Sequence, residues 1–378
     1  MPIPVPIRSA WRVGPSLSLR GLPLPRMSHQ VRLWASQSRY LLQCRSSGSS
    51  SIRRGHRLGC VSITIGIDVG GTKILGGLVD EDGTILATTR KATPRNDAMN
   101  VLEVVALVID ELRVAPPSPV AAVGVGIAGA VDVTMSTVIW APNLHWTNVP
   151  ARAVLEGRTG LGVVIENDGN AAAWAEHRFG AGVGIDEMVM VTVGTGVGGG
   201  IIHEGRLLRG SHGGAGEIGH LTMVVDGQPC GCGLRGCLEQ YASGSALVRT
   251  ARALSAHRRQ EAALLLGLGD GTPEGVQGIH VTEAARAGDP VAIEAFSVTG
   301  TWLGRGLASL SQVLDPAAYV IGGGVCEAGD LLLGSVRQSL RENIGGMGRN
   351  PVPEVRQATL GNDAGLIGAA DLARTVAR

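Results

Sequence analysis

Ile63-Thr-Ile-Gly-Ile-Asp68-Val-Gly-Gly-Thr-Lys73 is an apolar run that ends at an acidic residue and passes directly into a glycine turn. A second apolar run, residues 74–79, follows the turn, and this pattern predicts two strands joined in a hairpin. The design recurs where Met188-Val-Met-Val-Thr-Val193 runs into Gly194-Thr-Gly-Val-Gly-Gly-Gly200 and a further apolar pair. Two hairpins of this kind indicate an internal duplication.

Strand-like runs alternate with Ala- and Leu-rich helical stretches over most of residues 61–378. This alternation predicts a mixed α/β fold rather than an all-helical one. Because this part of the chain is longer than one small core usually requires, we expect two α/β domains.

The first 60 residues differ in composition from the rest: they contain ten arginines and no Asp or Glu, with many Pro and Ser. Such a segment cannot close a core, which predicts a disordered extension. It resembles an organellar transit peptide, although its Pro content and lack of an amphipathic pattern weaken that interpretation. The chain uses Arg almost to the exclusion of Lys, as GC-rich coding produces. In such DNA, non-coding sequence upstream of a gene also translates as Arg, Pro, Ser and Gly. We therefore expect that residues 1–60 are not part of the native protein, which would start near Val61.

The charge balance excludes some kinds of partner. All 32 acidic residues lie beyond residue 60, whereas ten of the 33 basic residues precede it, so the part expected to fold is acidic. An acidic domain argues against nucleic-acid binding. No run of about 18 apolar residues predicts a membrane span. The small number of cysteines favours a reducing, cytoplasmic location.

Glycine turns between strands can present backbone N–H groups to phosphate oxygens. Asp68, beside the first turn, would hold Mg²⁺ through water, and Thr72 and Thr195 would add hydroxyl donors. A third cluster, Gly322-Gly-Gly324, also follows a strand-like run. The alternative for either hairpin turn alone is an ordinary turn without a ligand. A Rossmann site is not expected, because the matching fingerprint at residues 194–199 precedes a β-rich run instead of a helix, and the Walker pattern is absent.

A compact set of metal ligands lies in Cys230-Gly-Cys232-Gly-Leu-Arg-Gly-Cys237, with His220 ten positions upstream. Thiolate and imidazole suit a tetrahedral zinc ion, and a shell of three Cys and one His is closed, so that the metal would be structural. The alternatives are three buried thiols without a metal, or a disulfide, which the close spacing disfavours. His220 has a second ring nitrogen with which it could also contact a substrate.

The candidate catalytic residue is Asp168, at the junction between the apolar run 163–165 and a helix-forming stretch. As a general base its carboxylate would accept the proton of an alcohol that attacks a γ-phosphoryl group, with Asn167 orienting the alcohol. The alternative role is a helix N-cap. Glu217 and Glu239 flank the cysteine segment and would contribute to a polar cluster that suits the hydroxyls of a sugar, unless they simply lie at the surface.

These residues together resemble the repressor, ORF and kinase (ROK) family of sugar kinases, in particular its zinc-containing bacterial glucokinases. The resemblance covers nearly all of residues 61–378: residues 68–73 match the first phosphate motif, and residues 193–220 have the spacing of the family signature and end in Gly216-Glu-Ile-Gly-His220. One departure is Ala128, where the family often has proline in a sugar-side loop. It leaves the sugar preference open.

The resemblance implies an actin-like (ribonuclease H-like) ATPase fold, with two α/β domains around a cleft. The small N-terminal domain would span residues 61–168 and be completed by residues 365–378, and the large domain with the zinc site would span residues 169–364. The implied roles are as follows: catalytic base, Asp168; sugar contacts, Asn167, Glu217, His220 and Glu239; ATP and magnesium, Asp68, Gly70, Gly71, Thr72, Lys73, Thr195, Gly196 and Gly323; zinc ligands, His220, Cys230, Cys232 and Cys237.

The implied activity is ATP-dependent phosphorylation of glucose to glucose 6-phosphate, by a homodimer or higher homo-oligomer that binds neither nucleic acid nor membrane. One alternative is a kinase for mannose, fructose, N-acetylglucosamine or N-acetylmannosamine. The other is a sugar-responsive regulator without turnover, although residues 1–60 lack the pattern of a helix-turn-helix.

Overall fold

The computed structural model describes residues 62–94, 97–114, 116, 119–345 and 351–376. The predictions for residues 1–60 and for a start near Val61 lie outside these residues. No helix among those that the structure describes has both the length and the apolar character needed to cross a bilayer.

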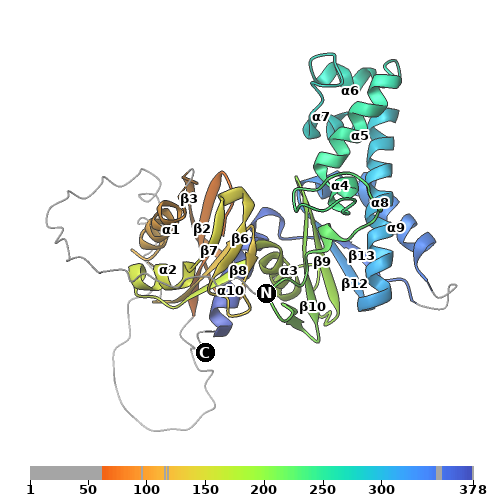
Figure 1. Ribbon diagram of the computed structural model, residues 1–378. Coiled ribbons are helices and arrows are strands. Elements are labelled where there is room, and N and C mark those ends of the chain that lie inside the picture. The colour runs from red at the N-terminus through yellow and green to blue at the C-terminus, as the bar shows by residue number, and fades with distance from the viewer. Residues whose placement is uncertain (1–61, 95–96, 115, 117–118, 346–350, 377–378) are drawn as a thin grey trace, which may run out of the picture. The chain divides into compact units, whose positions relative to one another are not determined.

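The first sheet has five strands in the order β3-β2-β1-β4-β8. Strands β2, β3 and β8 of this sheet are labelled in Figure 1. Strands β1, β2 and β3 are antiparallel neighbours, whereas β4 is parallel to β1, and β8 is parallel to β4. The bounds are β1 Ile63–Val69, β2 Lys73–Val79, β3 Ile85–Ala92, β4 Val120–Ile127 and β8 Val163–Asn167. The predicted hairpin of β1 and β2 is therefore present.

Helices cover this sheet, and one of them comes from the far end of the chain. Helices α1 (Ala98–Leu112) and α2 (Ala151–Thr159) pack together beside β2, β3 and β8, while α10 (Ala364–Val376) contacts β1 and β4. Helix α10 approaches closely because β1 and β4 have glycines beneath it: a Cβ at Gly66 would lie 2.0 Å from the Leu366 carbonyl oxygen, and one at Gly124 would lie 1.8 Å from that of Ala369. Side chains at these glycines would push the helix away from the sheet.

The second sheet repeats the topology of the first, with the order β11-β10-β9-β12-β13. Strands β9, β10 and β11 are antiparallel neighbours, and β12 and β13 continue the sheet in parallel from β9. The bounds are β9 Met188–Val193, β10 Val197–His203, β11 Arg206–Leu207, β12 Ala318–Gly322 and β13 Glu354–Gln357. This identical order and direction of strands agrees with the internal duplication that the sequence predicts.

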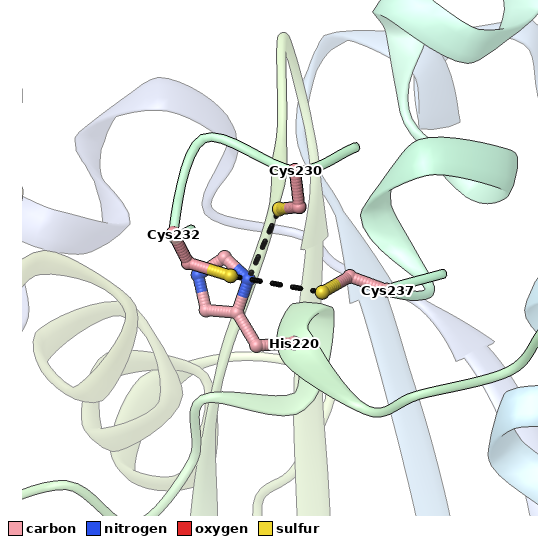
Figure 2. Close-up of side chains that lie close together, drawn as sticks. All are labelled: His220, Cys230, Cys232 and Cys237. Atoms are coloured by element: carbon pink, nitrogen blue, oxygen red, sulfur yellow. Dashed lines mark hydrogen bonds between the residues drawn. The ribbon is translucent and has the colours of Figure 1, made fainter. Parts of the chain in front are cut away.

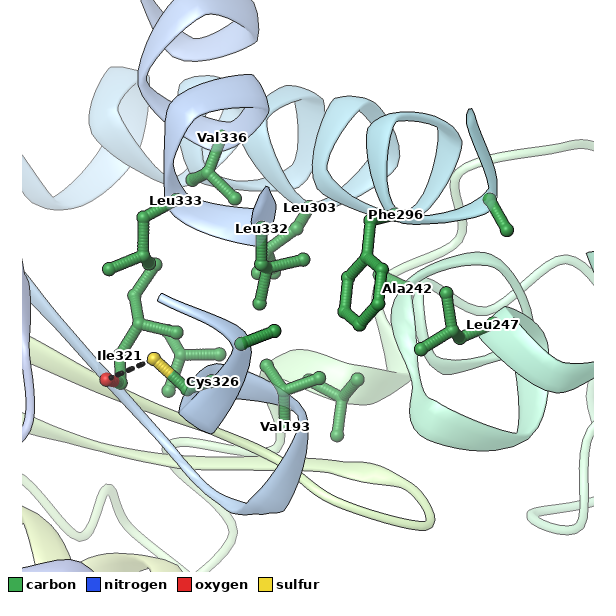
Figure 3. Packing of buried hydrophobic residues seen from close by; sticks show 14 of the residues in the cluster. Val193, Ala242, Leu247, Phe296, Leu303, Ile321, Cys326, Leu332, Leu333 and Val336 are labelled. Atoms are coloured by element: carbon green, nitrogen blue, oxygen red, sulfur yellow. Dashed lines mark hydrogen bonds between the residues drawn. The ribbon is translucent and has the colours of Figure 1, made fainter. Parts of the chain in front are cut away.

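The largest hydrophobic cluster among the described residues lies between the second sheet and helices α8 and α9. Figure 3 shows Phe296 and Leu303 of α8 and Leu332 of α9 packed over Val193 and Ile321 of the sheet. All five side chains are fully buried. The helices of this part are α3 Asp168–Phe179, α4 Glu239–Ala242, α5 Gly244–His257, α6 Ala263–Leu268, α7 Gly278–Arg286, α8 Pro290–Leu314 and α9 Asp330–Asn343.

A small three-stranded sheet and several short 3₁₀ helices complete the described elements. The small sheet pairs β5 (Ala130–Val131), β6 (Val138–Ala141) and β7 (Trp146–Val149). The 3₁₀ helices are η2 Pro142–Leu144, η3 Ile218–His220, η4 Gly324–Ala328 and η5 Gly361–Asp363. The proposed division into domains at residue 168 stays a prediction.

Candidate active site

The first glycine turn joins β1 to β2 and is held from the end of β3. The Gly70 amide donates to the Lys73 carbonyl (3.0 Å), which closes the turn. Thr93 donates its hydroxyl to the Gly70 carbonyl (2.7 Å) and its amide to the Thr72 carbonyl (3.1 Å). Gly71 and Thr72 are exposed, so that a ligand can reach this turn.

Two carboxylates, Asp68 and Asp168, lie at the same edge of the first sheet, because β1, β4 and β8 run parallel. Burial raises the pKa of Asp68 to about 6, with a further increase from the negative charge of Asp168 and an opposing effect of Lys73. Burial also raises the pKa of Asp168. The Gly169 amide, which donates to Oδ1 (2.9 Å), opposes this increase without cancelling it. Close carboxylates of this kind are typical of sites that bind a cation or move a proton.

Asn167, and not Asp168, is the N-cap of α3. Its Oδ1 accepts from the Asn170 amide (2.9 Å), and Asp168 is the first helical residue. The Asn167 Nδ2 donates to the Gly129 carbonyl (3.1 Å), which ties the end of β8 to the loop after β4. The structure thus gives the alternative role considered for Asp168 to its neighbour and leaves the Asp168 carboxylate available for chemistry.

The second glycine turn, residues 194–197, is held by side chains that follow the cysteine segment. The Gly194 amide donates to the Gly196 carbonyl (3.0 Å), and the Ser245 hydroxyl donates to the Thr195 carbonyl (2.8 Å). Glu239 Oε2 accepts from the Val197 amide (3.1 Å). Glu239, expected as a sugar contact, therefore lies against the backbone of this turn.

The third glycine cluster follows β12 and lies beside the end of β9. Gly323 has a φ of 87°, and a Cβ there would lie 2.5 Å from the Val193 carbonyl oxygen. Only glycine fits this position, because a side chain would meet both a strained backbone and a steric clash. Gly323 therefore lies next to the residue that precedes the second glycine turn.

His220, Cys230, Cys232 and Cys237 come together as the cysteine spacing predicts (Figure 2). Their ligand atoms all lie within 4.8 Å of one another. Cys230 Sγ is 3.7 Å from His220 Nδ1, and Cys232 Sγ is 3.7 Å from Cys237 Sγ. A zinc tetrahedron with bonds of about 2.3 Å to sulfur and about 2.1 Å to nitrogen has edges of about 3.6–3.8 Å. The two 3.7 Å separations match these edges, and the chemistry of the four donors suits zinc.

The environment of the thiols also suits a cation. Burial and the neighbouring cysteines raise the pKa of the Cys237 thiol to about 12, whereas hydrogen bonds from the Leu234 amide and the other two cysteines outweigh burial and lower the pKa of Cys232. Crowded thiolates repel one another, and a bound cation removes that repulsion. The nearby Cys230 Sγ lies 3.7 Å from Glu239 Oε1, so the cluster is adjacent to the carboxylate that holds the second glycine turn.

Glu217 and His220 lie on opposite ends of the short η3 segment. His220 Nε2, the nitrogen that faces away from the cysteine cluster, is 3.9 Å from Glu217 Oε2. Burial raises the pKa of Glu217; His220 lowers it, and the charges of Asp168 and Glu239 raise it further. The charges of Asp168 and Glu239 therefore act on the Glu217 carboxylate, and its role as a sugar contact stays a prediction.

Two further charged residues of this region are not among those that the sequence singled out. Glu166 is the only acidic residue of strand β8, and its carboxylate is paired with Arg209 at 2.7 Å. The one signal in the sequence is a charge inside an otherwise apolar run, residues 163–166. Such a charge is retained in an interior only with partners.

The chain is similar in sequence and in fold to known sugar kinases. It is 48% identical over 314 residues to a glucokinase of Streptomyces coelicolor, an alignment that covers 83% of this chain and 98% of the relative. A crystal structure of a ROK family glucokinase from Streptomyces griseus, in complex with glucose and AMPPNP, matches with a TM-score of 0.76 and 49% identity, over 83% of this chain and 100% of that one. A ROK hexokinase from Thermus thermophilus matches with a TM-score of 0.68 and 35% identity, over 83% and 98% of the two chains.

These similarities agree with the fold described above. The two sheets of equal topology with their helices have the actin-like ATPase fold of the matched sugar kinases, which confirms the fold class predicted from the sequence. The ROK family model matches residues 64–376. The protein is therefore a member of the ROK family.

Proposed function

We propose that this protein is an ATP-dependent glucokinase, which transfers the γ-phosphoryl group of ATP to glucose and releases glucose 6-phosphate and ADP. The observation that carries the proposal is the position of Asp168: its carboxylate lies at the sheet edge with Asp68 and is electrostatically coupled to Glu217. A base beside both a phosphate turn and a polar cluster suits transfer between a nucleotide and a sugar. The 48% identity to a glucokinase supports glucose as the acceptor.

Asp168 acts as the general base in this proposal. Its carboxylate accepts the proton of a sugar hydroxyl while that oxygen forms a bond to the γ-phosphorus, and the bond from the γ-phosphorus to the leaving oxygen of ADP breaks. The raised pKa of Asp168 suits this role, because a more basic carboxylate is the better proton acceptor. Asn167, Glu217, His220 and Glu239 are the proposed sugar-binding residues.

The glycine turns bind the nucleotide. Asp68 lies beside the exposed first turn and is proposed to hold Mg²⁺ through water, and Lys73 supplies a positive charge at the same turn. A bound magnesium ion supplies charge neutralisation at the phosphates. The residues proposed for ATP and magnesium are Asp68, Gly70, Gly71, Thr72, Lys73, Thr195, Gly196 and Gly323.

Zinc is proposed as a structural ion held by His220, Cys230, Cys232 and Cys237, because these four ligand atoms converge within 4.8 Å of one another. When bound, zinc supplies a fixed anchor for the cysteine segment. Because Nδ1 is the imidazole nitrogen on the cysteine side, Nε2 is left to donate to a sugar hydroxyl next to Glu217. The homo-oligomeric state and the cytoplasmic location remain predictions.

Turnover of the full chain tests the proposal. ADP release is measured with glucose, mannose, fructose, N-acetylglucosamine and N-acetylmannosamine under equal conditions. We expect kcat/KM for glucose to exceed that for each other sugar by about tenfold or more. A preference for an amino sugar would overturn glucose as the substrate. Absence of turnover with every sugar, from folded protein that contains about one zinc per chain, would contradict a kinase.

A further inference from the structure

Glu166 is a buried carboxylate immediately before the proposed sugar contact Asn167. It lies in β8 and is 2% exposed. Its three strand neighbours on the N-terminal side are the apolar, buried residues Val163, Val164 and Ile165. Because a charge in such a position lowers stability unless it is fully partnered, the contacts of Glu166 indicate its role.

The two oxygens of Glu166 bind different parts of the chain. Oε1 accepts from the Asn167 amide (3.0 Å) and from Asn170 Nδ2 (3.0 Å), so that it holds the junction of β8 and α3. Oε2 accepts from Arg209 Nε (2.7 Å), which comes from the loop after β11. One carboxylate thus connects the strand end that carries Asp168 to a loop 43 residues away.

The loop in question, residues 209–216, is closed on itself and packed tightly. The Ala215 amide donates to the Arg209 carbonyl (3.1 Å). Gly213 has a φ of 85°, and a Cβ there would lie 2.0 Å from the Val131 carbonyl oxygen. The loop therefore rests directly on β5 of the small three-stranded sheet.

The far end of the same loop returns to the same junction. A Cβ at Gly216 would lie 3.4 Å from Asn170 Oδ1, a buried oxygen without a hydrogen-bond partner in the part of the chain that the structure describes. Gly216 is followed at once by Glu217 and then by η3 with His220. The start of the loop is therefore bonded to Glu166, and its far end lies beside Asn170, the partner of Glu166.

We propose that Glu166 and Arg209 form a positioning pair for the sugar site: the pair fixes the loop 209–216, and with it Glu217 and His220, against the strand end that carries Asn167 and Asp168. Neither residue transfers a proton or binds the nucleotide. The inference rests on the proposed function, because Glu217 and His220 are sugar contacts only if the protein binds a sugar at this site.

The charge of the pair explains why we expect its loss to weaken sugar binding. Without Arg209 the Glu166 carboxylate keeps only its two neutral donors and is left without a counter-charge, and the loop loses the contact at its start. Both changes displace Glu217 relative to Asp168. The hydrogen bonds that hold the first glycine turn involve neither Glu166 nor Arg209. The affinity for ATP should therefore be preserved.

Steady-state kinetics of Arg209→Met, Glu166→Gln and the double variant test the proposal. We expect each single variant to raise KM for glucose about tenfold or more, with KM for ATP within about twofold of wild type. The double variant should be no worse than the poorer single variant, because the two residues act as a unit. Arg209→Lys, which keeps the charge, should recover part of the glucose affinity.

Matched controls come from helix α3. Glu176 is also a buried carboxylate, which accepts from the Ala181, Thr359 and Leu360 amides, and Arg178 pairs with the buried Asp371 at 3.2 Å. Glu176→Gln and Arg178→Met should lower the melting temperature while KM for glucose stays within about twofold. The proposal is overturned if the controls raise KM for glucose as much as Arg209→Met does, or if Arg209→Met raises the two KM values equally.

The outcome of this experiment is separable from that of the proposed function. If wild type phosphorylates glucose but Arg209→Met behaves like Arg178→Met, the positioning pair is wrong and the glucokinase proposal stands. If wild type prefers another sugar, the same variants are measured with that sugar, and a selective rise in its KM supports the pair. If wild type turns over no sugar, the proposed function fails, and equal binding of glucose by wild type and Arg209→Met in calorimetry would overturn the pair as well.

Discussion

The glycine turn after β1 and the glycine turn after β9 join hairpins of the same direction in sheets of the same order, but different side chains hold them. The first turn has charged residues at its ends, Asp68 and Lys73, and is supported by Thr93, which directly follows β3. The second turn has no charged residue of its own. Its support comes from Glu239 and Ser245, which follow the cysteine cluster.

This difference indicates that the two copies of one structural unit have different roles. The first turn places a carboxylate of raised pKa beside the candidate base, so it suits the charged phosphates and their cation. The second turn is a backbone scaffold whose shape depends on the segment that would bind zinc. Substitutions at the two turns should therefore fail in different ways.

The largest expected effect comes from Asp68→Asn in the first turn. Removal of the carboxylate proposed to hold magnesium should lower kcat by about 10²–10³-fold, because electrostatic stabilisation of the transferred group is lost. The zinc content should stay at about one per chain, since the cysteine cluster is untouched. Full turnover by Asp68→Asn at saturating magnesium would contradict the role of the first turn.

The same substitution should stabilise the free protein at pH 7. The pKa of Asp68 is raised in the fold from 3.8 to about 6, so ionisation of the buried carboxylate is unfavourable. The folded state binds more protons than the unfolded state between these values, and stability is lost as the pH rises from about 4 to about 6. Asparagine removes this cost, and we expect urea unfolding to show a gain of about 1–3 kcal/mol at pH 7. A loss of stability would contradict the burial of the charge.

Loss of the metal should act through the second turn. Cys232→Ser, or chelation of the wild type, should lower turnover about ten- to a hundredfold, because Glu239 follows Cys237 closely and would no longer be held against Val197. Cys326→Ser is the matched control: Cys326 is a buried thiol outside the cluster, with Sγ 3.1 Å from the Ile321 carbonyl oxygen. Metal analysis and turnover are measured together. A metal-free protein with unchanged activity would show that the scaffold does not need zinc.

The smallest expected effect is the change of kcat/KM with pH, which should reflect the ionisation of Asp68 at the first turn. Asp68 and Asp168 are proposed to act as carboxylates, and both have raised pKa values. kcat/KM should therefore rise through pH 6, where about half of Asp68 is ionised, and level off near pH 7. At pH 5 about a tenth of Asp68 is ionised, so kcat/KM should be about tenfold below its value at pH 7. A flat profile between pH 5 and pH 7 would disagree with the buried environment of these groups.

The repeated hairpins and the metal cluster could be predicted because their signals are local. Alternating apolar runs and glycines mark β1 and β2, and all the cysteines of the cluster lie within one short turn-rich segment. The contact of Glu239 with Val197 could not be predicted, since it depends on how the chain returns across 42 positions. The choice between Asn167 and Asp168 as N-cap was equally open, because both residue types favour that position.

The buried pair of Glu166 and Arg209 shows the same limit. In the sequence, Glu166 is a single charge in an apolar strand, and Arg209 is one of many arginines. Only the folded chain shows that the two meet at 2.7 Å. Residues that position a site from a distance therefore require the structure, whereas residues of a compact motif do not.

Turnover and glucose binding of Asp168→Asn test the central claim most directly. This substitution keeps the size of the side chain and removes its ability to accept the proton, while the cap from Asn167 to helix α3 is preserved. We predict that kcat falls by about 10²–10⁴-fold, whereas calorimetry still shows glucose and ATP binding close to that of wild type. Full turnover by folded Asp168→Asn would contradict the assignment of Asp168 as the base and with it the proposed mechanism.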